Sequence, residues 1–174
     1  CHGCDEHFYE RAVAVGVYEK ALASEIVHLK TTPFISKYLS QEVARTLDRS
    51  LFPEFDLVIP VPLAKERLIE RGFNQAAVIA KLVAVHLNVP HDELSLSRTK
   101  HTPIHRMSMD RRGRELTVEK AFSVDRPKLI FGRSILLVDD VLTSGSTVSA
   151  CAKALTKNGA ANVIVFTLAR AVLR

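Results

Sequence analysis

The sequence of 174 residues contains few cysteines and no apolar run that approaches the length of a membrane span. Apolar runs such as 57–61 and 163–166 are far shorter than the about 20 residues that a transmembrane helix needs. The sequence also shows no signal peptide, in which a basic segment precedes an apolar one, no internal repeat and no low-complexity linker. Its 47% hydrophobic and 25% charged residues are typical of one globular domain, with no room for a second catalytic domain. We therefore predict a cytoplasmic protein with a sizeable core.

The three cysteines are too few for a disulfide scaffold. Cys151 lies in a segment with helical periodicity, and we predict that it is a packed core thiol. Cys1 and Cys4 form a Cys-X-X-Cys pair, which is half of a tetrahedral zinc site, and no second pair follows. His2 and His7 are further candidate ligands, but we expect residues upstream of the sequence to carry the missing ones. A redox dithiol and a lipidated N-terminus at Cys1 are the alternatives.

One stretch, Ile135–Thr147, combines a buried strand, two acids and a loop rich in hydroxyl groups. Its first four residues are apolar, as in a parallel strand covered on both faces. Asp139 and Asp140 are therefore expected at the carboxyl end of this strand, where open α/β sheets bind ligands. The loop that follows offers hydroxyls, a glycine and backbone N–H groups at the start of a helix, where an anion is favoured. Its residues are Thr143, Ser144, Gly145, Ser146 and Thr147.

A ribose 5-phosphate group satisfies these features together. Its phosphate would lie in the loop 143–147, and its 2- and 3-hydroxyl groups would face Asp139 and Asp140. Carboxylates accept hydrogen bonds from sugar hydroxyls, and they can meet a phosphate through a divalent cation. The alternative is that the two acids merely end the strand while Ser146 or Thr147 caps the helix. The pattern resembles the phosphoribosyl diphosphate signature of the type I phosphoribosyltransferases.

The net charge of +5 resides in one segment, Arg98–Arg114. This segment holds six of the 24 basic residues and one of the 19 acidic residues, which leaves 18 of each elsewhere. A solvated surface loop, a flap over a diphosphate and a nucleic-acid contact are the competing interpretations. The segment has no Phe, Tyr or Trp, so it offers attraction to phosphates but no base stacking. Its place between two predicted strands favours the flap, since type I phosphoribosyltransferases carry a flexible loop there.

The hydrophobic pattern predicts strands that alternate with helices. Strands are expected at 12–17, 56–61, 94–97, 121–124, 135–138 and 162–168, and helices at 21–29, 32–47, 74–87 and 146–157. Thr32 and Pro33 are predicted to begin the second helix, Asn74 to cap the third, and Leu63–Arg71 to form a polar connection. Such alternation implies right-handed crossovers and an α/β fold with a mainly parallel sheet flanked by helices.

Further segments narrow the identity of the chain. They are Cys1-His2-Gly3-Cys4, Leu29-Lys30, Pro60-Val61-Pro62-Leu63 and Arg71-Gly72-Phe73-Asn74-Gln75. With the Asp139 motif they resemble the ComF family, which includes GntX-type members and comprises phosphoribosyltransferase-like proteins associated with competence and DNA uptake. The resemblance implies a type I phosphoribosyltransferase-like domain at 11–174, preceded by the remnant of an N-terminal zinc ribbon at 1–10. Cys1 and Cys4 would be the second cysteine pair of that ribbon, with Zn²⁺ bound if the missing residues are present.

The resemblance also implies that the chain binds phosphoribosyl diphosphate (PRPP) with Mg²⁺. Asp139, Asp140 and the loop 143–147 would hold the ribose phosphate, while a pyrophosphate loop would meet the diphosphate. That loop comprises Leu63, Ala64 and Lys65. Arg71 is predicted to contact the diphosphate with them, because Gly72 and Phe73 would fix its place. Lys65 is equally well explained as a surface charge.

Single-stranded DNA and the DNA-uptake machinery are the implied partners. The alternative is an active phosphoribosyltransferase, in which Arg106 or Arg111 would balance the charge of the departing diphosphate. No recognisable hood or base-recognition motif names an acceptor. The basic segment also departs from the family pattern, because Thr102-Pro103 is followed by Ile104 rather than by glutamine.

Overall fold

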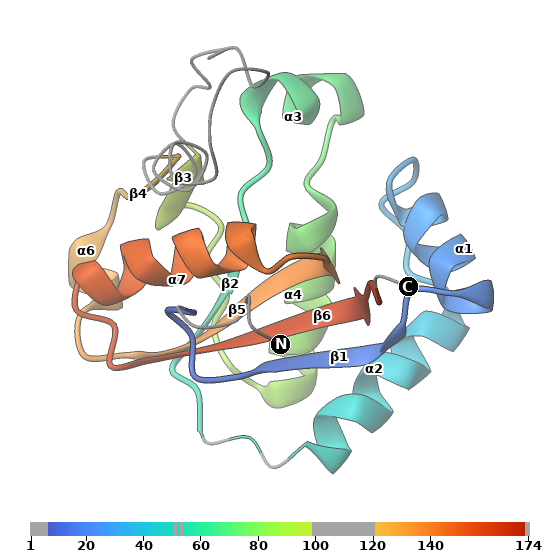
Figure 1. The fold of residues 1–174 in the computed structure, drawn as a ribbon, viewed down its shortest axis with the longest axis horizontal. Helices are drawn as coiled ribbons and strands as arrows, with labels where there is room; N and C mark the ends of the chain where they lie inside the picture. The colour runs from blue at the N-terminus through green and yellow to red at the C-terminus, as the bar shows by residue number, and fades with distance from the viewer. Residues whose placement is uncertain (1–6, 51, 53, 99–120, 173–174) are drawn as a thin grey trace.

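The computed structural model describes residues 7–50, 52, 54–98 and 121–172. Its centre is a four-stranded sheet in the order β1-β6-β5-β2, in which every neighbouring pair is parallel. The strands are β1 (Ala12–Val17), β2 (Leu57–Pro60), β5 (Ser134–Leu142) and β6 (Asn162–Arg170). A separate antiparallel pair joins β3 (Leu96–Arg98) to β4 (Phe122–Val124). The predicted mainly parallel α/β fold is confirmed (Figure 1).

Helices cover both faces of the sheet. The side chains of α1 (Lys20–Leu29), α2 (Lys37–Arg49) and α4 (Gln75–Leu87) share one buried cluster with Leu136 and Val138 of β5. The side chains of α7 (Ser146–Lys157) and of the short α6 (Pro127–Ile130) form a second cluster with Ile135 and Leu137. Cys151 of α7 is a fully buried free thiol, as predicted, and burial raises its pKa. The continuous apolar run of β5 therefore reflects burial on both faces.

The second helix begins later than predicted. The N–H groups of Thr31 and Thr32 still donate to the carbonyl of His28, so this part of the chain closes α1 and the predicted start at Thr32 is wrong. Ser36 is the N-cap instead, and its Oγ accepts a hydrogen bond from Leu39 N at 3.1 Å. Leu39, Val43 and Leu47 recur at a spacing of four residues and form the buried stripe of α2.

The predicted polar connection at 63–71 is in fact mostly helical. It forms α3 (Lys65–Arg71), which buries none of its residues and stands away from the sheet at the top of Figure 1. Gly72 ends α3 with a left-handed φ of +77°, and Asn74 then caps α4 by accepting a hydrogen bond from Ala76 N. Only three residues therefore separate the two helices. The predicted cap at Asn74 is confirmed.

Strand β5 is longer than its apolar run. It continues through Asp139 and Asp140 to Leu142, because β6 extends far enough to pair with it, with Asp139 opposite Thr167 and Leu142 opposite Arg170. The two acids are therefore part of the paired strand and do not follow its end. None of the helices within the described ranges is both long and apolar enough to cross a membrane.

Candidate functional site

The loop 143–147 joins the end of β5 to the start of α7. Gly145 is the N-cap of α7, with a left-handed φ of +76° and no hydrogen bond from a capping side chain. The structure therefore contradicts the alternative in which the hydroxyl of Ser146 or Thr147 caps this helix. The Oγ atoms of Ser144 and Ser146 lie 3.0 Å apart. Ser146 N donates to Ser144 Oγ at 3.4 Å, and the positive end of the dipole of α7 points to this loop, where an anion is favoured.

A pocket lies against this loop and opens to solvent. Its empty volume is about 210 Å³, part of which is open solvent. Asp139 lines it together with Thr143, Gly145 and Thr147. The structure therefore brings the first acid and three of the five predicted loop residues to one small cavity.

The segment before β1 packs against this loop, a contact that the sequence analysis did not predict. A Cβ atom at Gly145 would lie 3.1 Å from Tyr9 Oη and 3.3 Å from His7 Cε1. The two rings stack with centroids 4.8 Å apart, and Phe8 N donates to Ser149 Oγ at 3.3 Å. Gly145 is therefore required twice, by its positive φ and by the close approach of these rings.

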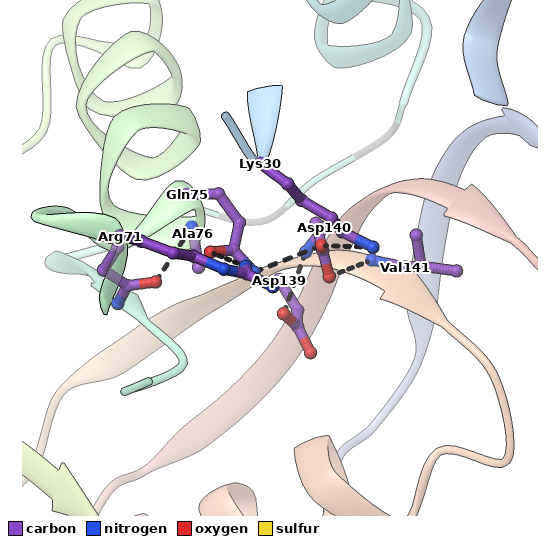
Figure 2. A network of polar contacts seen from close by, with 8 residues as sticks. Lys30, Arg71, Gln75, Ala76, Asp139, Asp140 and Val141 are labelled. Carbon is purple, nitrogen blue, oxygen red and sulfur yellow. Dashed lines mark hydrogen bonds and ion pairs between the residues drawn. The ribbon is translucent and has the colours of Figure 1, made fainter. Parts of the chain in front are cut away.

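The two acids have different surroundings. Because β5 continues past both, their side chains leave the strand in different directions (Figure 2). Asp139 Oδ1 accepts a hydrogen bond from Asp140 N at 2.9 Å. Burial, and secondly the charge of Asp140, raise the pKa of Asp139 to about 8. At pH 7 this carboxyl group is therefore largely protonated in the ligand-free chain.

Asp140 is held by three groups of the chain itself. Its Oδ1 accepts from Val141 N at 2.8 Å, and its Oδ2 accepts from Gln75 Nε2 at 3.3 Å. Lys30, which caps the end of α1, places Nζ 3.7 Å from the same Oδ2 (Figure 2). Gln75 in turn accepts from Arg71 Nη1 at 3.0 Å. Lys30 and Gln75 belong to the Leu29-Lys30 and Arg71–Gln75 segments, but their contact with an acid far along the chain leaves no signal in the sequence.

The predicted pyrophosphate loop lies at the same edge of the sheet as the acids. Val61 N donates to Val138 O at 2.8 Å, which holds the end of β2 beside β5. Asn74 Nδ2 donates to Val61 O at 3.0 Å and ties this end to the start of α4. Ala64 is the N-cap of α3 without a side-chain cap bond, and Lys65 is exposed. Leu63 and Ala64 are partly buried.

Several predicted residues lie outside the part of the chain that the structure describes. They are Cys1, Cys4, Arg106 and Arg111. Among the described residues, no group of three or more His, Cys, Asp or Glu side chains is arranged to hold a metal ion. The zinc site and the flap therefore stay predictions.

Comparison with known proteins gives a consistent result. The family described as phosphoribosyl transferase domain matches residues 74–172. The chain is 33% identical over 169 residues to "DNA utilization protein YhgH" of Salmonella typhi, with 93% of this chain and 73% of that protein covered. It is 32% identical over 182 residues to "Competence protein F" of Haemophilus influenzae, with 98% and 78% covered.

A solved structure also resembles the fold. The glutamine phosphoribosylpyrophosphate amidotransferase of B. subtilis, complexed with ADP and GMP, matches with a TM-score of 0.51 and 21% identity. The match covers 74% of this chain but only 25% of that one. This likeness concerns the fold alone, and it agrees with the predicted type I phosphoribosyltransferase architecture.

Proposed function

We propose that this chain, which belongs to the ComF family and carries a phosphoribosyl transferase domain, binds PRPP together with Mg²⁺. The observation that carries the proposal is the pocket that Asp139 shares with Thr143, Gly145 and Thr147 at the uncapped start of α7. The 5-phosphate would lie on the loop 143–147, and the ribose hydroxyls would meet the two acids. A cavity lined by a carboxyl group, hydroxyls and backbone N–H groups suits a sugar phosphate.

The protonation of Asp139 favours an anionic ligand. A carboxyl group with a pKa of about 8 is mostly neutral at pH 7, so it repels an approaching phosphate less than a carboxylate would. This proton would be displaced when Mg²⁺ binds, because the ion is held by the carboxylate form.

The donor set also fits Mg²⁺, because carboxylate and hydroxyl oxygens are the ligands that this ion prefers. Asp139 and Asp140 are the residues that would hold it with the ligand. When bound, the ion would neutralise part of the diphosphate charge. The remaining diphosphate charge would meet the predicted pyrophosphate loop, whose Lys65 is exposed at the start of α3.

The decisive experiment is calorimetric binding of PRPP, with and without Mg²⁺, to the natural chain and to the Asp139→Asn, Asp140→Asn double variant. We expect binding that Mg²⁺ strengthens and that the double variant loses. Asp125→Asn changes an exposed acid directly after β4. It is the matched control and should bind PRPP like the natural chain. Absence of binding by a well-folded natural chain would contradict the proposal.

We further propose that PRPP binding serves the handling of DNA in the cytoplasm. This role is supported by the names of the relatives, "DNA utilization protein YhgH" and "Competence protein F". Single-stranded DNA would be attracted by the basic segment Arg98–Arg114, so its affinity should fall steeply with salt. The substitution of Arg111, Arg112 and Arg114 by alanine should reduce both the affinity and the salt dependence. A DNA affinity that neither salt nor these substitutions change would refute this role.

The second candidate function is an active phosphoribosyltransferase, favoured by the family match at 74–172. The bond between ribose C1 and the diphosphate oxygen would break, the diphosphate would leave, and an acceptor nucleophile would bond to C1. Arg106 or Arg111 would stabilise the leaving charge. Release of pyrophosphate above background with a panel of bases and amines would establish turnover.

Metal analysis of the purified chain, with the Cys1→Ser, Cys4→Ser double variant as the comparison, would test zinc binding separately.

A further inference from the structure

The motif Arg71–Gln75 brings two side chains together across the three-residue connection between α3 and α4. Gly72 ends α3 in the left-handed conformation, and Asn74 begins α4. This geometry places Arg71, the last residue of α3, within hydrogen-bond distance of Gln75, the first residue of α4. The same Gln75 reaches Asp140 on β5, so one side chain joins α3 to the acidic pair (Figure 2).

The chemistry of the three groups explains why the middle one is a glutamine. A guanidinium group only donates hydrogen bonds, and an ionised carboxylate only accepts them. A carboxamide has one end of each kind, so its Oε1 can accept from Arg71 while its Nε2 donates to Asp140. A glutamate at this position would lose the donor, and a lysine would lose the acceptor. The direction of both hydrogen bonds is therefore fixed by the partners.

Burial makes this arrangement rigid. Gln75 is 7% exposed and the Asp140 side chain is 13% exposed, so water competes little for these hydrogen bonds. With Val141 N on Oδ1, and Gln75 and Lys30 on Oδ2, both carboxylate oxygens of Asp140 are engaged. The guanidinium group of Arg71 is likewise engaged by Gln75.

We propose that Gln75 is a positioning residue that fixes Asp140 for the ribose. Arg71 affects ribose binding indirectly, by holding Gln75 in place. This inference rests on the proposed function. It differs from the direct diphosphate contact that the sequence predicts for Arg71. It also gives the Arg-Gly-Phe-Asn-Gln segment a role in the ribose half of the site.

The test uses two probes, ribose 5-phosphate, which has no diphosphate, and PRPP. Calorimetry with Mg²⁺ would compare the natural chain with Arg71→Ala, Gln75→Met and the double variant. Each single change should weaken ribose 5-phosphate about tenfold, the effect of one lost hydrogen bond to a charged group. The double variant should bind no more weakly than Gln75→Met alone, because both changes interrupt one chain of contacts.

Two further variants sharpen the result. Gln75→Glu keeps an acceptor for Arg71 but removes the donor to Asp140, so it should weaken ribose 5-phosphate at least as much as Gln75→Met. Gln41→Met, at an exposed position on α2, is the matched control and should change neither affinity. The inference is overturned if Arg71→Ala weakens PRPP but not ribose 5-phosphate, or if Gln75→Glu binds like the natural chain.

A ligand-free measurement separates this inference from the proposed function. If the natural chain binds neither probe, the proposed function fails, but the contact can still be examined by NMR. The side-chain amide resonances of Gln75 should shift in Arg71→Ala and in Asp140→Asn, and stay in place in Gln41→Met. Unchanged resonances in the first two variants would overturn the inference.

Discussion

The replacement of Asp139 by asparagine tests the electrostatics of the site without any ligand. The folded chain raises the pKa of this carboxyl from 3.8 to about 8, so between these pH values the folded state holds a proton that the unfolded state has lost. The contribution of Asp139 to stability is therefore complete below pH 4 and declines as the pH rises towards 8. Asparagine resembles the protonated acid at every pH. The variant and the natural chain should thus be similarly stable near pH 4 and diverge above it.

The size of this divergence follows from the pKa shift. A shift of about four pH units corresponds to a ceiling of ~6 kcal/mol. We expect about half of it, ~3 kcal/mol in favour of the variant at pH 9, because water and neighbouring dipoles relax around an ionised carboxylate. Urea unfolding at pH 4.5, 7 and 9 would measure it, with Asp125→Asn as the control. A difference in stability that stays constant across this pH range, or an asparagine variant that is less stable at pH 9, would refute the reasoning.

Three other changes probe the surroundings of the site by urea unfolding. Gly145→Ala should lose ~1–2 kcal/mol of stability from its positive φ, and more from contact with Tyr9. Gly132→Ala has a similar φ and open space around it, so it should show the backbone effect alone. Equal losses of stability in the two variants would argue against the ring contact. Asn74→Ala should lose ~1–2 kcal/mol with the cap of α4 and the bond to Val61, and a neutral effect would contradict this. Leu39→Ala, on the buried face of α2, should lose ~2–5 kcal/mol of stability, and a loss below 1 kcal/mol would contradict the burial of Leu39.

Local patterns were sufficient to predict most of the architecture. The run Ile135–Val138 is apolar because both faces of β5 are buried, and the stripe of α2 repeats because one face packs on the sheet. The sequence pattern failed at α3, whose two central apolar residues, Leu68 and Ile69, are exposed. A helix without a buried face has no hydrophobic period that a sequence can display.

The chemistry of the site was only partly predictable, for a similar reason. The loop 143–147 is continuous in the sequence, so its glycine and hydroxyls could be assigned together. The length of β5 depends on pairing with β6, and the neighbours of the acids come from α1 and α4. The rings of His7 and Tyr9 reach Gly145 from the opposite end of the chain. Such contacts exist only once the fold has formed, and no local pattern records them.

Two acids that are neighbours in the sequence thus enter the site in different electrostatic settings. Asp140 has a lysine and a carboxamide on one oxygen, whereas Asp139 lines the pocket at the loop 143–147, where desolvation raises its pKa to about 8. If both were ionised and uncompensated, their charge would oppose the binding of the proposed anionic ligand at the start of α7. Because one is protonated and the other has a cation beside it, the ligand-free site carries little net negative charge. Substitutions at the two positions should therefore differ: asparagine at 139 relieves a burial penalty, whereas asparagine at 140 leaves Lys30 without its acidic partner.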